Sequence, residues 1–311
     1  MSWSTTQIPD LSGRWAMVTG ASRGLGHHVT LELARAGAGV VMAGRNPDRL
    51  AASADLVRRE VPAADVRSVS LDLADLSAVR GTAEQVLDSY EHLDLLVDNA
   101  GVMATPERTT ADGFELQIGT NHLGHFALTG LLLPALLASP HGARVVITSS
   151  VAHRTVSGID LRSLVAGADP RPYRKWRAYG ESKLANLLFM LELERRAATG
   201  DLALLSVAAH PGYAATELQT AGPGLGGDTI SSRLMSLTNK VAAQPAAQGA
   251  WPLLMAATQP GLPGGAYVGP GGPGEVRGRP RLVGMSAAAS DPDLGRRVWE
   301  ASEAATGVSW P

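Results

Sequence analysis

The 311-residue chain contains no cysteine. This absence excludes disulfide bonds, thiolate catalysis and zinc sites built on cysteine. Lysine is also scarce, because the basic residues are nearly all arginines and lysine occurs only at Lys175, Lys183 and Lys240. With a net charge of −2, the chain lacks the basic surface typical of nucleic-acid binding. We therefore expect no nucleic-acid partner.

Long apolar runs are missing as well. The longest, such as LLLPALLA, are far shorter than the ~20 residues that span a bilayer. The first residues, MSWSTTQIPDLSGRW, carry no basic and apolar export signal. The chain is 45% apolar and 18% charged, which suits a globular protein with a sizeable core. We expect a cytoplasmic protein without a membrane span.

Short apolar, β-branched runs alternate along the chain with stretches in which apolar residues recur every three or four positions. The second pattern predicts helices, for example over 25–37, 76–90 and 182–198. The first pattern predicts strands over 16–20, 39–44, 66–72, 93–101, 143–150 and 202–210, with a last one at 266–269. Such alternation is typical of βαβ units. We predict an α/β fold: a single domain over 1–311 with a doubly wound parallel sheet (Rossmann fold) of about seven strands and helices on both faces.

Three stretches interrupt this alternation. Residues 151–172 read as a long loop. Residues 213–240 mix glycine, hydroxyl and Leu/Met side chains, and we interpret them as a lid over a substrate, with a plain surface excursion as the alternative. The segment 261–311 begins with a Gly/Pro-rich run over 261–280 that is expected to wrap around the surface.

A glycine-rich octet, TGASRGLG, joins the first predicted strand to the first helix. Glycine at Gly20, Gly24 and Gly26 lets a pyrophosphate approach the backbone, and the helix that begins near Gly24 points its free N–H groups at it. The strand–turn–helix setting turns the octet into a predicted dinucleotide site.

The end of the second strand indicates which dinucleotide is bound. Proteins that bind NAD usually place Asp or Glu there to accept a hydrogen bond from the ribose. Here Gly44 stands in that place, Arg45 follows it, and Arg23 lies in the glycine turn. Two guanidinium groups can pair with a 2′-phosphate, which favours NADP(H) while leaving NAD(H) compatible. The alternative is that both arginines are solvated surface residues.

Tyr179 and Lys183 lie four residues apart, on one face of a predicted helix. A phenol with a pKa of ~10 is a poor base at neutral pH, and lowering that pKa to about 7 takes some 4 kcal/mol. A cation ~4 Å away supplies about that much at an effective dielectric constant of ~20. We therefore expect a partly buried Lys183, helped by the positive nicotinamide of an oxidised cofactor, to lower the pKa of Tyr179.

Other polar residues are ambiguous by themselves. Ser150 ends a predicted strand, where open α/β sheets bind ligands, and Asn121 lies in a helix where asparagine is a mediocre former. His122 and His125 are spaced i, i+3, but no third ligand accompanies them, so we expect packed or solvated histidines and no metal. His210 is expected at a strand end.

Taken together, these motifs resemble the short-chain dehydrogenase/reductase family over residues 10–270. GTNHLGHFALT, SSVAH and AYGESKLANLLF are similar to its retinol-dehydrogenase-like and protochlorophyllide-reductase-like branch. The resemblance rests on segments in the family's order and spacing: Thr19–Gly26, Asp72, Asn99–Gly101, Asn121, Ser150, Tyr179–Lys183 and His210–Gly212.

The resemblance implies the role of each site residue. Tyr179 would be the general acid/base, Lys183 would lower its pKa, and Ser150 would bind the substrate oxygen. Asn121 would hold a water in the proton relay. The cofactor-binding residues would be Gly20, Ser22, Arg23, Gly24, Leu25, Gly26, Arg45, Asp72, Leu73, Asn99, Ala100, Gly101, Tyr179, Lys183, Pro211, Gly212 and Thr216.

The sequence departs from the family at two points. Asp98 replaces the first of two usual asparagines, and the separation of Ser150 from Tyr179 is longer than most members have. We predict an NADP-dependent oxidoreductase that interconverts a carbonyl and an alcohol on a small-molecule substrate. The sequence leaves open whether the chain forms a homo-oligomer. The alternatives are a non-catalytic NADP(H)-sensing protein and an epimerase of nucleotide sugars.

Overall fold

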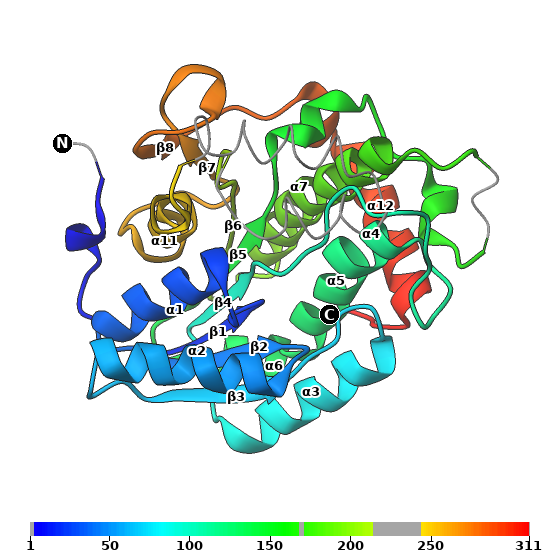
Figure 1. Cartoon of the computed structure of the whole chain (residues 1–311). Coiled ribbons are helices and arrows are strands. Elements are labelled where there is room, and N and C mark those ends of the chain that lie inside the picture. Colours follow the sequence, from blue (N-terminus) through cyan, green and yellow to red (C-terminus); the bar gives the residue numbers. More distant parts are fainter. Residues whose placement is uncertain (1–2, 168–170, 214–243, 311) are drawn as a thin grey trace.

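The computed structural model describes residues 3–167, 171–213 and 244–310. Within them the strands form one sheet in the order β3-β2-β1-β4-β5-β6-β7-β8 (Figure 1). The strands are β1 Trp15–Thr19, β2 Gly39–Gly44, β3 Val66–Ser70, β4 Leu95–Asp98, β5 Ala143–Thr148, β6 Leu204–Ala209, β7 Tyr267–Pro270 and β8 Pro280–Leu282. Strands β1 to β7 are parallel, and β8 pairs antiparallel with β7. This confirms the predicted doubly wound fold.

The sheet has eight strands in place of the predicted seven. The additional strand, β8, is only three residues long, begins with Pro280, and lies within the segment predicted to be irregular. Proline is tolerated there because β8 is an edge strand, where one row of backbone N–H groups has no partner strand. A strand that short carries no alternating pattern that a sequence could display.

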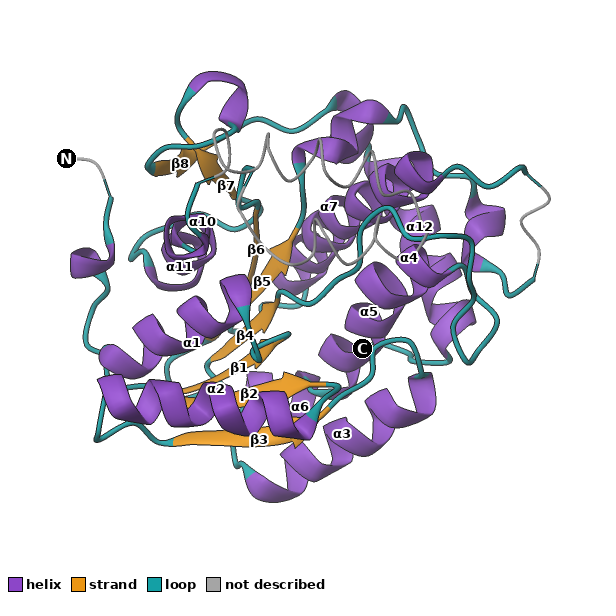
Figure 2. Cartoon of the chain, in the orientation of Figure 1, coloured by secondary structure: helices purple, strands orange, loops and turns teal. Residues whose placement is uncertain are grey.

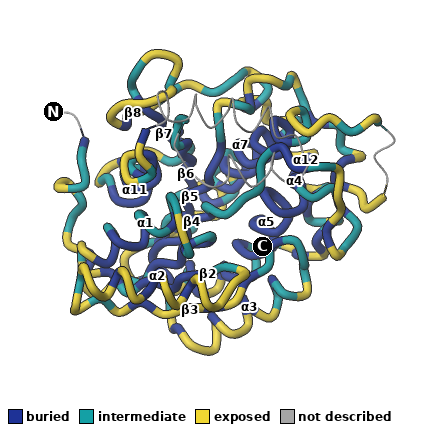
Figure 3. Tube along the Cα trace, viewed as in Figure 1, coloured by how far each residue is buried: buried dark blue, intermediate teal, exposed yellow. Residues whose placement is uncertain are grey.

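Two layers of helices cover the sheet (Figure 2). One face carries α1 Gly24–Arg35, α2 Pro47–Glu60, α10 Ala246–Gly249 and α11 Trp251–Thr258. The other face carries α3 Leu76–Ser89, α4 Leu116–Ile118, α5 Gly124–Leu131, α6 Leu133–Leu137, α7 Lys175–Thr199 and α12 Pro292–Thr306. The central strands are consequently buried on both sides, as Figure 3 shows in dark blue. This double cover explains why their sequences are continuous apolar runs.

Short helical turns complete the described chain. The 3-10 turns are η1 Thr5–Gln7, η3 Val151–Thr155, η4 Leu161–Leu164, η5 Pro273–Glu275 and η6 Ala287–Ser290, and a π-helical turn, η2, covers Gly119–Leu123. Two of these turns lie in 151–172, so the predicted loop is partly helical. The helix α7 begins seven residues before its predicted start at 182.

The C-terminal helix α12 packs against α5 and α7 through aromatic rings. The ring of Trp299 lies 5.1 Å from that of Phe126 and 5.8 Å from that of Phe189, and Trp310 lies 4.8 Å from Trp299, all between ring centroids. Edge and tilted aromatic pairs of this kind stabilise a core beyond the area that they bury. The C-terminal segment 261–311 therefore contains a helix that packs on the core.

No helix in the described ranges is both long enough and apolar enough to cross a membrane. Almost all of 213–240, predicted to be a lid, lies outside the described residues. A single domain over 1–311 stays a prediction, as does a homo-oligomer.

Candidate active site

A cavity of about 210 Å³ opens at the carboxyl ends of β1, β2 and β4. The predicted cofactor residues that line it are Gly20, Ser22, Arg23, Gly24, Leu25, Gly26, Arg45, Asp72, Leu73, Asn99, Ala100 and Gly101. Six further residues that line the cavity were not among the predicted cofactor residues: Gly44, Asn46, Arg49, Leu71, Val102 and Thr120. Of these, the sequence analysis considered only Gly44, because it stands where NAD-binding proteins have an acidic residue. Open α/β sheets bind ligands at this edge, so the dinucleotide motif and the cavity coincide.

The glycines of the octet are needed for two different reasons. Gly20 and Gly24 have φ angles of +68° and +56°, a backbone conformation that other residues rarely adopt. Gly26 is required for space, because a Cβ there would lie 2.3 Å from the carbonyl oxygen of Gly20. The helix α1 can therefore begin directly against the turn, with its N-terminus at the cavity.

Three arginines gather around the cavity mouth. Burial and the charges of Arg49 and Arg45 lower the pKa of Arg23, so the three guanidinium groups are close enough to repel one another. Arg49 lies in the first turn of α2, whose N-cap, Asn46, accepts a hydrogen bond from Arg49 N at 2.9 Å. The signal for this third cation is the Asn46-Pro47 pair, a favoured N-cap followed by proline at the first helical position, which places Arg49 in the first turn. Mutual repulsion of this kind is relieved by an anion.

The floor of the cavity is held by Thr19 at the end of β1. Its Oγ1 accepts hydrogen bonds from the backbone N–H groups of Asn99 and Ala100, both at 2.9 Å. The side chain of Asn99 returns a bond to the carbonyl of Thr19 at 2.8 Å. On the other side, Gly124 lets α5 approach Leu73, because a Cβ would meet the Leu73 carbonyl at 2.4 Å.

Asn121 lies in the π-helical turn η2 and is fully buried. Its Nδ2 donates to the carbonyl of Val102 at 2.9 Å and to Ser182 Oγ at 3.0 Å, and its Oδ1 accepts from Val102 N at 2.7 Å. A Cβ on Gly101 would lie 2.9 Å from Asn121 Oδ1 and 3.7 Å from Lys183 Nζ. Gly101 is therefore the point at which the cavity meets the predicted catalytic residues.

Tyr179 and Lys183 are both buried on α7, with 6% and 4% of their surfaces exposed. Lys183 Nζ lies 5.8 Å from the centre of the Tyr179 ring and donates to the carbonyl of Thr148 at 3.1 Å. Burial lowers the pKa of Lys183 to about 8. The helix thus presents both groups to one site, as the i, i+4 spacing predicted.

In the protein chain by itself, Lys183 does not lower the pKa of Tyr179, and the expected lowering by Lys183 together with an oxidised cofactor stays a prediction. Burial raises the pKa of Tyr179 to about 12, and a hydrogen bond with Ser150 offsets part of that rise. The reason is that removing a phenolate from water costs more than the hydrogen bond returns. At neutral pH the phenol therefore keeps its proton.

Ser150 lies just beyond β5, which ends two residues before it. As the N-cap of η3 its Oγ accepts from Ala152 N at 3.2 Å, which leaves the hydroxyl hydrogen to be donated. The backbone carbonyl of Ser150 accepts from His153 Nδ1 at 2.6 Å, and His153 Nε2 accepts from Ser286 N at 3.2 Å. His153 therefore ties the Ser150 turn to the C-terminal segment.

The segment predicted to contact the nicotinamide is described only in part, because Thr216 lies outside the described residues. Pro211 and Gly212 follow β6, and a Cβ on Gly212 would lie 2.4 Å from the carbonyl of Val276. His210 is buried at the strand end, with Nε2 3.0 Å from Glu275 Oε2 and Nδ1 accepting from Gly212 N at 3.2 Å. These contacts fasten the segment that the family resemblance assigns to the nicotinamide.

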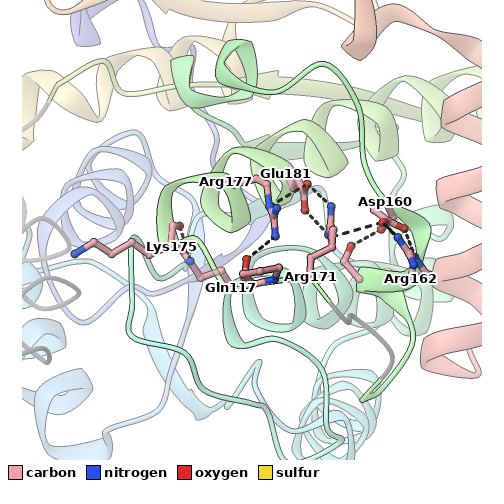
Figure 4. A network of polar contacts seen from close by, with 9 residues as sticks. Gln117, Asp160, Arg162, Arg171, Lys175, Arg177 and Glu181 are labelled. Carbon is pink, nitrogen blue, oxygen red and sulfur yellow. Dashed lines mark hydrogen bonds and ion pairs between the residues drawn. The ribbon is translucent and has the colours of Figure 1, made fainter.

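The segment 151–172, which precedes α7, is held in place by ion pairs (Figure 4). Arg171 donates to Glu181 at 3.0 and 3.2 Å and lies 3.5 Å from Asp160. Gln117 Nε2 donates to the carbonyl of Lys175 at 2.9 Å, at the first residue of α7. These contacts fix the start of the helix that carries Tyr179.

His122 and His125 are both buried and have protein partners. His122 Nε2 lies 2.7 Å from Ser302 Oγ on α12, whereas His125 points to the opposite side, toward Thr19. Across the described part of the chain, no three histidine, aspartate or glutamate side chains gather as metal ligands would.

Comparison with known proteins agrees with this geometry. The family model described as short chain dehydrogenase matches residues 14–160. Retinol dehydrogenase 13 of Homo sapiens is 41% identical over 243 residues, covering 76% of this chain and 71% of that protein. The chain belongs to the short-chain dehydrogenase/reductase family. Its retinol-dehydrogenase-like branch is confirmed as well.

Three further proteins extend this similarity over more of the chain or to a bound cofactor. Polyprenol dehydrogenase of Mus musculus is 39% identical over 97% of this chain and 86% of its own length. The crystal structure of an uncharacterized protein from Mycobacterium Paratuberculosis covers both chains completely, with a TM-score of 0.80 and 40% identity. A short chain dehydrogenase from Escherichia coli CFT073, complexed with NADPH, gives a TM-score of 0.55 and 28% identity over 69% of this chain and 83% of its own. This short-chain dehydrogenase/reductase is thus an oxidoreductase of CH–OH and C=O groups with a nicotinamide cofactor.

Proposed function

We propose that this chain is an NADP(H)-dependent oxidoreductase that interconverts a carbonyl and an alcohol. The observation that carries the proposal is the meeting of two sets of residues at Gly101. The cavity lined by glycine and arginine residues ends there, and Asn121 and Lys183 lie directly beyond it. A dinucleotide in the cavity would therefore present its reactive end to the buried polar residues.

The preference for NADP(H) rests on charge. Arg23, Arg45 and Arg49 surround the cavity mouth, and no aspartate or glutamate occupies the end of β2. Guanidinium groups bind phosphate oxygens in a bidentate manner, so a 2′-phosphate would relieve the repulsion among the three. The NADPH bound to the relative from Escherichia coli supports this choice.

In this proposal Tyr179 moves the proton. When bound, the nicotinamide supplies or accepts a hydride. Tyr179 is protonated at neutral pH, and so it can donate to the oxygen of a carbonyl substrate while Ser150 donates a second hydrogen bond. Lys183 places a cation near the phenol, and the burial of Tyr179 and Lys183 keeps water away from both groups.

The substrate that we propose is an apolar, isoprenoid-type alcohol or the matching carbonyl compound. Retinol and polyprenol dehydrogenases both carry such alcohols in their names. In this chain Trp176 is 50% exposed, and its ring centroid lies 6.3 Å from that of Tyr179. Val151, next to Ser150, is also exposed. Large apolar side chains beside the reacting groups suit an apolar substrate.

Location in the cytoplasm stays a prediction.

A screen of NADPH consumption over aldehydes and ketones tests the proposal, with isoprenoid aldehydes included. Tyr179→Phe serves as the blank, because it keeps the ring and removes only the hydroxyl. We expect turnover by the native chain to exceed that of Tyr179→Phe by at least about a hundredfold. Near-native turnover by Tyr179→Phe would exclude this mechanism, and tight NADPH binding without turnover would favour a sensing protein.

A further inference from the structure

His125 lies one helical turn beyond Asn121, at the start of α5, and is 1% exposed. Its Nδ1 lies 3.1 Å from the backbone carbonyl oxygen of Asn121, and its Nε2 lies 2.9 Å from Thr19 Oγ1. It therefore bridges the helix of a predicted catalytic residue and the strand that opens the cofactor cavity.

The position of each hydrogen follows from what the partners can do. A carbonyl only accepts, so Nδ1 carries the ring hydrogen and Nε2 accepts from the hydroxyl of Thr19. That hydroxyl directs its one hydrogen to Nε2 at 2.9 Å in preference to the Val97 carbonyl at 3.4 Å, and its lone pairs accept from Asn99 N and Ala100 N. Burial lowers the pKa of His125 to about 3, which agrees with this neutral ring. The donors and acceptors match throughout.

These bonds close into a ring around the cavity floor. Residues 99–102 line the cavity, and Thr19 holds the start of that segment while Asn121 holds its end through two bonds to Val102. His125 joins Thr19 to Asn121, so the segment is clamped at both ends by one connected set of side chains. No contact between His125 and the cavity is needed for this.

We propose that His125 is a positioning residue that keeps residues 99–102 in the conformation that binds the cofactor. The inference rests on the proposed function, because it assigns to that segment a role in dinucleotide binding. The role of His125 is inferred from the closed set of hydrogen bonds that joins Thr19, residues 99–102, Asn121 and His125. Removing His125 would leave the Thr19 hydroxyl with only the Val97 carbonyl, 3.4 Å away, as an acceptor and would free the link to Asn121.

His122 provides a matched control within the same motif. It is equally buried, but it bonds to Ser302 and packs on Phe126 and Phe189, on the side away from the cavity. A substitution there removes a buried histidine hydrogen bond of the same kind without touching the ring of bonds. Loss of folding stability alone would therefore affect both variants alike.

The experiment compares His125→Phe with His122→Phe by titrating each with NADPH and measuring its melting temperature. We expect the Kd for NADPH to rise about tenfold in His125→Phe and to stay within about twofold in His122→Phe, with both melting temperatures lowered. His125→Asn, which can still donate to the Asn121 carbonyl, should recover part of the affinity.

A double-mutant cycle with Thr19→Val provides a second measurement. Because both substitutions open the same ring, Thr19→Val/His125→Phe should bind NADPH no more weakly than the worse single variant. An unchanged Kd in His125→Phe, or additive losses in the double variant, would overturn the role of His125 and leave the proposed function intact. A native chain that binds neither NADPH nor NADH would overturn both.

Discussion

The cofactor cavity and the predicted catalytic residues lie at the same edge of the sheet, yet they differ in exposure. Arg23, Arg45 and Arg49 at the cavity mouth are exposed, whereas Asn121 and Lys183 are buried. The guanidinium groups at the cavity mouth are in contact with water, whereas the ammonium group of Lys183 is removed from it. The two regions of one sheet edge thus hold their polar side chains in opposite environments.

The difference has a physical cause. A phosphate is recognised by several guanidinium groups, which need no tuning because arginine is always charged. At the buried residues, burial itself changes the pKa: it raises that of Tyr179 to about 12 and lowers that of Lys183 to about 8. Residues in the two regions should therefore respond to substitution in different ways.

The largest effect is expected from Lys183→Met, which keeps the length of the side chain and removes the buried cation. We expect kcat/KM to fall by about a hundredfold or more, with no loss of folding stability, since a buried ammonium is costly. Lys175→Met, on the exposed first turn of the same helix, should leave both unchanged. Steady-state kinetics and thermal melting measure these effects. A Lys183→Met enzyme with native kcat would mean that burial of this lysine serves the fold only.

Charge reversal at the cavity mouth is the next test. Arg45→Asp should raise KM for NADPH about tenfold or more while KM for NADH changes little, because an acid repels the 2′-phosphate and accepts from a ribose hydroxyl. Arg49→Asp should act in the same direction but less. Arg59→Asp, exposed at the end of α2 and outside the cavity, is the control for net charge. If KM rose equally for both cofactors, the three arginines would not be binding the 2′-phosphate.

The smallest effect concerns stability and pH. Burial raises the pKa of Asp98 to about 8 although Thr129 donates to it at 2.9 Å, and within the described residues its Oδ1 has no partner. The folded chain therefore holds a proton that the unfolded chain loses near pH ~4, and stability falls as the pH rises from ~4 to 8.

Asp98→Asn removes this titration. We expect its melting temperature to exceed that of the native chain by a few degrees at pH ~8, with the difference vanishing near pH ~4. Asp94→Asn is the control, because Asp94 accepts from Trp15 N and Ser139 Oγ, both at 2.7 Å, and should lose stability at both pH values. A native chain as stable as Asp98→Asn at pH ~8 would show that Asp98 ionises freely.

Much of the fold and of the cofactor cavity could be predicted because the signals are local. Twelve of the predicted cofactor residues line one cavity, and the strands lie where buried β-branched runs occur. The glycines of the octet predict the turn because a backbone with positive φ and a helix packed at contact distance exclude other residues. The missed Arg49 lies in the first turn of α2, and the Asn46-Pro47 pair that opens this helix is a local signal for it.

The sequence by itself indicated the alternation of strands and helices along the chain, the glycine turn and the placing of Tyr179 and Lys183 on one helix face, since each depends on residues within a few positions of one another. Only the tertiary structure decided the direction of the Tyr179 pKa, the partners of His125, and the place of α12 against α5 and α7. Burial and long-range hydrogen bonds are properties of packed neighbours. Thr19 and His125 stand 106 positions apart and meet only because the sheet brings the end of β1 beside α5.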